Sequence, residues 1–194
     1  MFWESILPNP LAGAAQAVAA QPVMDDEVFA GFYERSARSL WAYLARTSGD
    51  PALAEDLMQE SYVRFLTAPN PPSHVADGEV ACRRYLFRIA TNLMRDHWRR
   101  PRAASIEDIP ENFFAQPSDA SQSESRMILG PALAKMRPRE RQLLWLAHAE
   151  GYSHHEIAEV TGLGSASIRL LLFRARRKIA RLLEEGNRGR RQAC

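Results

Sequence analysis

Residues 152–176, YSHHEIAEVTGLGSASIRLLLFRAR, contain two helical patterns on either side of a glycine turn. Ser153 followed three residues later by Glu156 is a capping box, which marks the start of a short helix. Gly162 supplies the turn, because glycine tolerates the left-handed backbone that ends many helices. A longer helix then begins near Ser165. A short helix, a tight turn and a second helix predict a helix-turn-helix.

The longer helix has one apolar and one basic side. With Ile168 as origin and a turn of about 100° per residue, an apolar set falls within about 60° and is predicted to be buried. This set is Leu171, Leu172, Ala175, Ile179, Leu182 and Leu183. The set predicted to be exposed is Arg169, Leu170, Phe173, Arg174, Arg177 and Arg181. Arginines on such a helix hold phosphates or read guanine.

Leu170 and Phe173 are exceptions on this basic side. Two large apolar side chains are costly to expose without a use. Thymine methyl groups, a protein partner or a neighbouring helix of the same domain would each cover them. The residues alone leave these three alternatives open.

The remainder of the chain also has a helical period, since Leu, Ala, Arg and Glu recur at three- and four-residue spacings with little strand-like alternation. Asp50-Pro51 opens one such helix, with an N-cap acceptor before a proline. We expect an all-α protein with two small helical domains joined by a flexible linker. The expected segments are an N-terminal extension (1–24), a first domain (25–101), an acidic linker (102–126), the helix-turn-helix domain (127–185) and a basic tail (186–194).

The formal net charge of +2 conceals a strong segregation of charge along the chain. Residues 25–67 carry 4 Arg against 8 Asp and Glu, whereas residues 82–102 carry 7 Arg against one Asp. Residues 131–194 carry 13 Lys and Arg against 6 Glu. Two separate basic blocks predict contact with nucleic acid at two places, because counterion release rewards clustered cations. The alternative is that these are solvated helix faces.

The first basic block is a predicted helix over residues 79–99, in which aromatic residues alternate with arginines. Tyr85, Phe87, His97 and Trp98 suit the stacking of unpaired bases, although at least half of them are expected to be core. The preceding loop, Ala68–Gly78, contains three prolines and cannot be helical. We expect this loop to form a pocket for an extruded base.

The sequence gives little indication of a disulfide, a metal site or a catalytic site. Cys82 and Cys194 suggest neither a disulfide nor a thiolate metal site, and His154-His155 lacks further ligands at a suitable spacing. The carboxylates near Glu55 have no histidine or nucleophile beside them. We therefore expect no metal, cofactor or enzymatic activity. No apolar run approaches the roughly 20 residues that span a bilayer, so we expect no membrane insertion and a cytoplasmic protein.

Three stretches of the chain resemble the extracytoplasmic-function sigma factors, a family of bacterial transcription initiation factors. Asp50–Glu60 resembles the family's polymerase-binding helix, and Tyr85–Arg100 resembles the helix that melts and reads the promoter's minus-ten element. Met136–Arg141 and Tyr152–Ala158, continued through Arg174–Arg176, resemble the domain that binds the duplex minus-thirty-five element. The resemblance covers about residues 25–185 and implies region 2-like and region 4-like domains.

The resemblance and the basic faces together give the expected site residues. Those expected to bind polymerase, at the clamp helices of its largest subunit, are Glu55, Asp56, Gln59 and Glu60. Those expected to bind the minus-ten region are Arg88, Asn92, Arg95, Asp96, Trp98, Arg99 and Arg100. Those expected to bind the minus-thirty-five region are Ser165, Ser167, Arg169, Arg174 and Arg177. Leu170 and Leu171 depart from the family, which has a small polar residue and an arginine there.

The implied function is that of an alternative sigma factor. Such a protein binds the clamp and flap regions of RNA polymerase core, recognises both promoter elements as duplex and melted DNA, and promotes strand opening. An anti-sigma protein is a further implied partner. A free-standing helix-turn-helix regulator is the main alternative, and a helical adaptor whose basic faces bind acidic proteins is another.

Overall fold

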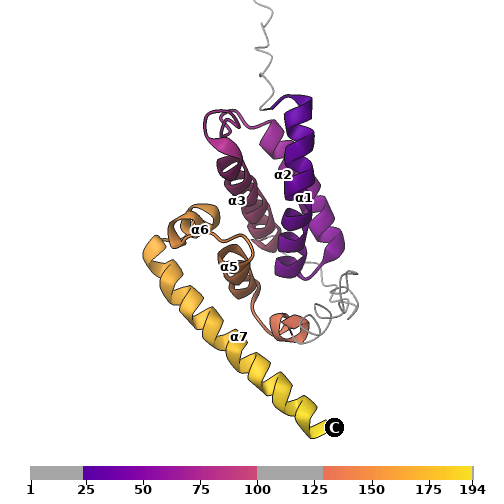
Figure 1. Cartoon of the computed structure of the whole chain (residues 1–194), viewed down its shortest axis with the longest axis vertical. Coiled ribbons are helices and arrows are strands. Elements are labelled where there is room, and N and C mark those ends of the chain that lie inside the picture. Colours follow the sequence, from indigo (N-terminus) through magenta and orange to yellow (C-terminus); the bar gives the residue numbers. More distant parts are fainter. Residues whose placement is uncertain (1–23, 100–128, 194) are drawn as a thin grey trace, which may run out of the picture.

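The computed structural model describes residues 24–99 and 129–193 of the 194-residue chain, with side chains described as far as Arg188. Its helices, shown in Figure 1, are α1 (Asp26–Ser48), α2 (Pro51–Leu66), α3 (Gly78–Arg99), α5 (Pro138–His148), α6 (His154–Thr161) and α7 (Ser165–Ala193). A further helical turn covers 129–134, and the described residues contain no strand. The prediction of an all-α fold is confirmed. The predicted linker, Arg100 and all but the last residue of the predicted extension lie outside the described residues.

Helices α1 and α2 begin and end at residues whose side chains or backbone suit those positions. Asp25 accepts a hydrogen bond from the Val28 N–H at 2.8 Å, and Asp50 accepts one from Leu53 at 3.1 Å. Gly49 ends α1 with a φ of 79°, a left-handed conformation that glycine adopts without strain. The Asp50-Pro51 helix start predicted from the sequence is confirmed.

The first three helices form a bundle around a core of aromatic and aliphatic side chains. Phe32 of α1 stacks on Phe65 of α2 with ring centroids 5.4 Å apart. Phe87 of α3 is fully buried, with its ring 5.1 Å from that of Tyr43. Of the four aromatic residues considered for base stacking, Phe87 is therefore a core residue, whereas Trp98 is exposed. Met24, the last residue of the predicted extension, is buried in this core.

Helices α6 and α7 form the predicted helix-turn-helix. The Ser153 and Glu156 capping box is present, and Gly162 ends α6 with a φ of 69°. On α7, Ile168, Leu172 and Ala175 are buried, and the rest of the predicted apolar face is half-buried. The predicted exposed face is exposed at every position. Helix α7 continues to Ala193, so the residues expected to form a basic tail are largely helical.

The two helical units pack against each other and share one hydrophobic core. Helix α5 lies against α1, and α6 lies against α3, while α7 runs along the outer side (Figure 1). Gln142 of α5 donates a hydrogen bond of 2.7 Å to the Tyr43 hydroxyl, which also bonds Thr91 of α3 at 2.6 Å. Arg141 donates to the Thr47 carbonyl at 2.8 Å. The sequence did not predict this packing of one unit on the other.

Candidate polymerase and nucleic-acid surfaces

The predicted polymerase-binding residues share one exposed face of α2. Glu55, Asp56, Gln59 and Glu60 are all exposed, and the face opposite them is buried in the first bundle. Their printed contacts lie within the helix: Gln59 reaches Glu55 at 3.5 Å, and Glu60 pairs with Arg64 at 2.7 Å. Exposed pairs of this kind contribute little to stability. The face therefore carries net negative charge and is open to a partner.

The predicted minus-ten residues of α3 also share a face. Arg88, Arg95, Asp96, Trp98 and Arg99 are exposed and Asn92 is half-buried. The Arg95 guanidinium donates to the Asn92 amide oxygen at 2.7 Å, which orients both side chains. Arg100 lies outside the described residues. The structure thus brings the described members of the predicted set together along one side of α3.

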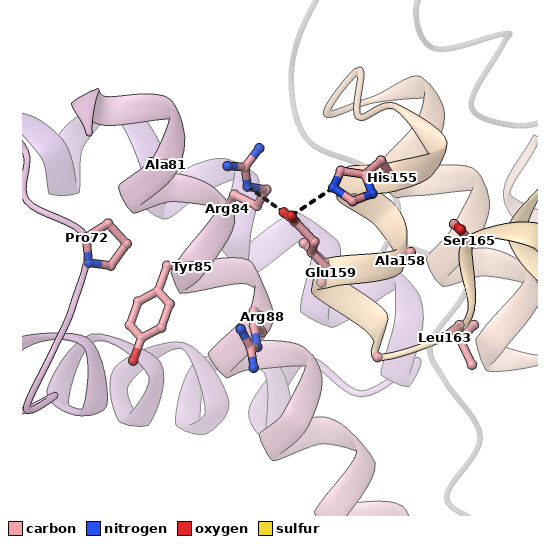
Figure 2. A pocket seen from close by; sticks show the side chains of 12 residues that line it. Pro72, Ala81, Arg84, Tyr85, Arg88, His155, Ala158, Glu159, Leu163 and Ser165 are labelled. Atoms are coloured by element: carbon pink, nitrogen blue, oxygen red, sulfur yellow. Dashed lines mark ion pairs between the residues drawn. The ribbon is translucent and has the colours of Figure 1, made fainter. Parts of the chain in front are cut away.

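A cleft separates the first part of this face from the helix-turn-helix (Figure 2). Pro72 of the proline-rich loop lines it together with Tyr85 and Arg88 of α3, so the loop and the basic helix meet as the sequence suggested. The opposite wall contains Glu159 of α6. Arg84 crosses the cleft and binds Glu159 through Nε at 3.2 Å. An ion pair across the cleft therefore joins the helix-turn-helix to this side of α3.

Arg84 also binds Glu156, with 2.7 Å between the guanidinium and carboxylate. Hydrogen bonds from the backbone N–H and hydroxyl of Ser153 hold the pKa of the Glu156 carboxyl below its ordinary value, and Arg84 lowers that pKa further. Glu156 is therefore ionised at neutral pH. The same carboxylate caps α6 and binds the first bundle.

A second cleft lies farther along α3 and is lined by arginines from both units. Arg95 and Arg99 line it from α3, and Arg137 and Arg139 line it from the start of α5. Trp98 lies among them and is 36% exposed. Four guanidinium groups around one cleft suit an anionic ligand such as a nucleic-acid phosphate.

Glu150 joins three helices and was not among the residues predicted from the sequence. Its side chain is 2% exposed and accepts hydrogen bonds from Arg83 of α3 at 2.7 and 3.1 Å. It also accepts one from the Trp145 indole at 3.1 Å and one from the Ser39 hydroxyl of α1. In the sequence, Glu150 is only an acidic residue before a glycine, which gives no sign of a buried ion pair.

The predicted minus-thirty-five residues share the exposed side of α7. Ser165, Ser167, Arg169, Arg174 and Arg177 are all exposed. Leu170 and Phe173 lie between them and are also exposed, so no neighbouring helix of the described residues buries them. One of the three alternatives for this pair is thereby removed.

Comparison with known proteins identifies the family. Residues 32–104 match the model for sigma-70 region 2, and residues 126–179 match the model for sigma-70 region 4. The RNA polymerase sigma factor CarQ of Myxococcus xanthus is 32% identical over 166 residues, which cover 82% of this chain and 91% of CarQ. The chain belongs to the extracytoplasmic-function sigma factors. The family assignment made from the sequence is confirmed.

Two further similarities agree with this assignment. The ECF RNA polymerase sigma factor SigL of Mycobacterium tuberculosis is 28% identical to this sigma factor over 181 residues, covering 90% of this chain and 96% of SigL. The sigma factor RpoE of Bartonella quintana, solved in complex with the anti-sigma factor NepR, has the same fold, with a TM-score of 0.58 at 19% identity over 81% of this chain and 98% of RpoE. The chain is an alternative sigma factor that acts in transcription initiation.

Two kinds of structural feature are absent from the described part of the chain. None of its helices is long and apolar enough to cross a membrane. No group of three or more His, Cys, Asp or Glu side chains there is arranged to hold a metal ion.

Proposed function

We propose that this sigma factor docks on polymerase core through the acidic face of α2 and reads two promoter elements with the basic faces of α3 and α7. One observation carries the proposal. Oppositely charged residues that lie far apart in the sequence are sorted onto three separate exposed helix faces. A surface that contacts only solvent would not require like charges to be grouped on separate faces.

The acidic face is the proposed contact with the clamp. Asp56, Gln59 and Glu60 extend from adjacent turns of α2 and would pair with basic helices of the polymerase, because complementary charge steers association. The helix-turn-helix unit would lie at the flap. No enzymatic step by the sigma factor itself is needed.

The two basic faces would bind different forms of DNA. On α3, Trp98 with Arg95 and Arg99 combines stacking with phosphate binding, which suits the melted minus-ten strand. On α7, an exposed arginine face follows a short helix and a tight turn, which suits the major groove of the duplex minus-thirty-five element.

Promoter binding requires the two units to separate. The two elements lie roughly 25 base pairs apart, or roughly 85 Å along the duplex at 3.4 Å per step. In the structure α3 and the helix-turn-helix line the same clefts. The 29 residues of the segment 100–128 reach at most about 100 Å when extended, which is enough to join units bound at both elements.

Transcription with purified bacterial core polymerase tests the proposal. The wild-type chain should give promoter-dependent initiation. Reversing charge with Asp56→Arg and Glu60→Arg should weaken core binding at least 100-fold, since like charges across an interface cost several kcal/mol. Glu34→Arg, at an exposed position on α1, is the matched control and should change binding less than threefold. Duplex binding that is equally tight without core would instead identify a free-standing regulator.

We further propose an anti-sigma protein as partner and the cytoplasm, where promoter DNA lies, as the site of action. The complex of the Bartonella quintana relative with NepR supports the first point. Competition between an anti-sigma protein and core polymerase for binding to this chain would verify the proposed anti-sigma partner.

A further inference from the structure

Leu170 and Phe173 form an exposed apolar pair in the middle of the basic face of α7. Their side chains are 50% and 58% exposed, and a separation of three residues places them on one side of the helix. Ile168 and Leu172, on the opposite side, are buried in the core. Leu171 is half-buried and packs against that core, so it does not belong to the pair.

The charges around the pair indicate what covers it. Between Ser165 and Leu183, α7 contains six Lys and Arg residues and no Asp or Glu. Arg169, Arg174 and Arg177 are exposed and form no ion pair with any described residue. A duplex supplies phosphates along both walls of the major groove, and thymine methyl groups lie between those walls.

We propose that Leu170 and Phe173 select thymine in the minus-thirty-five element by packing on its C5 methyl groups, while the three arginines hold the flanking phosphates. This inference rests on the proposed role of α7 in binding that element. The thymine methyl is the apolar group that distinguishes base edges in the major groove. An apolar pair therefore favours thymine without any hydrogen bond to a base.

The spacing of the pair restricts which base pairs it contacts. Side chains three residues apart on a helix have Cβ atoms about 5–6 Å apart, which is less than two base-pair steps of about 3.4 Å. Leu170 and Phe173 therefore contact thymines in neighbouring base pairs, on one strand or on both.

The test uses polymerase holoenzyme containing the full chain. A promoter library with a randomised minus-thirty-five region is selected for binding, and each selected thymine is then replaced by deoxyuridine. This replacement removes the methyl group and keeps base pairing, and it leaves the protein unchanged. We expect an affinity loss of about fourfold at each of two neighbouring positions, as for one buried methyl-sized group.

Alanine variants show which of the two side chains contacts which thymine position. Leu170→Ala should abolish the difference between thymine and deoxyuridine at one position, and Phe173→Ala should abolish it at the other. Both positions are exposed, so the fold should tolerate the changes. Leu129→Ala, at an exposed leucine outside α7, is the control and should retain both differences.

Three outcomes would overturn the inference. The first is a selected element that tolerates deoxyuridine at every thymine. The second is an equal loss on thymine and deoxyuridine promoters in Leu170→Ala, which would place the pair against a protein surface. The third is an element without thymine. Each leaves promoter-dependent initiation intact, whereas failure of the wild-type chain to support initiation would contradict the proposed function itself.

Discussion

Replacement of Glu150 tests whether the ion pair between the two helical units stabilises their packing. The Glu150→Ala substitution removes a nearly fully buried carboxylate that accepts hydrogen bonds from three residues, Arg83 on α3, Trp145 on α5 and Ser39 on α1. The donors of all three residues lose their acceptor at once. We expect the helix-turn-helix unit to detach more readily from the first bundle.

The expected loss of stability follows from how deeply Glu150 and Arg83 are buried. Removing one member of a buried ion pair costs about 3–5 kcal/mol, because the other charge is left without compensation. Arg83 is 26% exposed, so water can partly replace the lost carboxylate. We therefore expect a loss of about 3 kcal/mol, at the lower end of that range. Such a loss lowers the equilibrium constant for packing of the two units by roughly 150-fold.

Two measurements separate packing of the units from global stability. Urea unfolding followed by circular dichroism gives the free energy of unfolding, and amide hydrogen exchange gives the local stability of α5 and α6. Exchange in α5 and α6 should accelerate more than exchange in α2. Glu185→Ala removes an exposed pair with Arg181 on α7 and should cost less than about 0.5 kcal/mol.

A double-mutant cycle decides whether the ion pair is responsible. If Glu150 acts mainly through Arg83, Arg83→Ala and Glu150→Ala should be strongly non-additive, with a coupling of at least about 1 kcal/mol. A cost below about 1 kcal/mol for Glu150→Ala, or additive single effects, would refute the reasoning.

Three further predictions concern the helix-turn-helix. Arg169→Ala should reduce the slope of log binding constant against log salt concentration by about 0.9 and should weaken binding similarly at all minus-thirty-five sequences, as expected for loss of one phosphate contact. Folding lowers the pKa of Glu156 from its ordinary value of 4.5, so its stabilising contribution is complete above that pH and is lost as the pH falls through the folded-state pKa. Unfolding free energies measured between pH 6 and 3 should therefore fall less steeply in Glu156→Gln. Gly162→Ala should cost about 1–2 kcal/mol by thermal unfolding because of its positive φ, whereas Gly186→Ala, in open space on α7, should be neutral or stabilising.

The helix-turn-helix could be predicted because its signals are local. Ser153 and Glu156 are three residues apart, and Gly162 marks the turn wherever the unit packs. The division of α7 into buried and exposed sides also depends on one helical period alone. The exposed face of α2 could be predicted in the same way, because its four polar residues occupy adjacent turns.

Phe87 shows why the rest could not be predicted. A helix packed on one side would leave this residue near the edge of its apolar stripe, among arginines. In the structure α3 is covered from two directions, with Tyr43 of α1 and Tyr152 of the second unit 5.1 and 6.1 Å from the Phe87 ring. The burial of Phe87 and of Glu150 depends on contacts between residues distant in the sequence, which no local pattern records.

The composition of the contact between the units bears on how they separate. Its outer part consists of ion pairs, Arg84 with Glu156 and Glu159 among them, and these groups are rehydrated when the units part. Such interfaces between domains are typically more polar than permanent ones and open at lower cost. While the units are packed, the two carboxylates bind Arg84, and the helix-turn-helix lines the same clefts as the proposed minus-ten face of α3. Under the proposed function, occupation of that face by DNA would therefore oppose this packing, and promoter binding would favour the separated units.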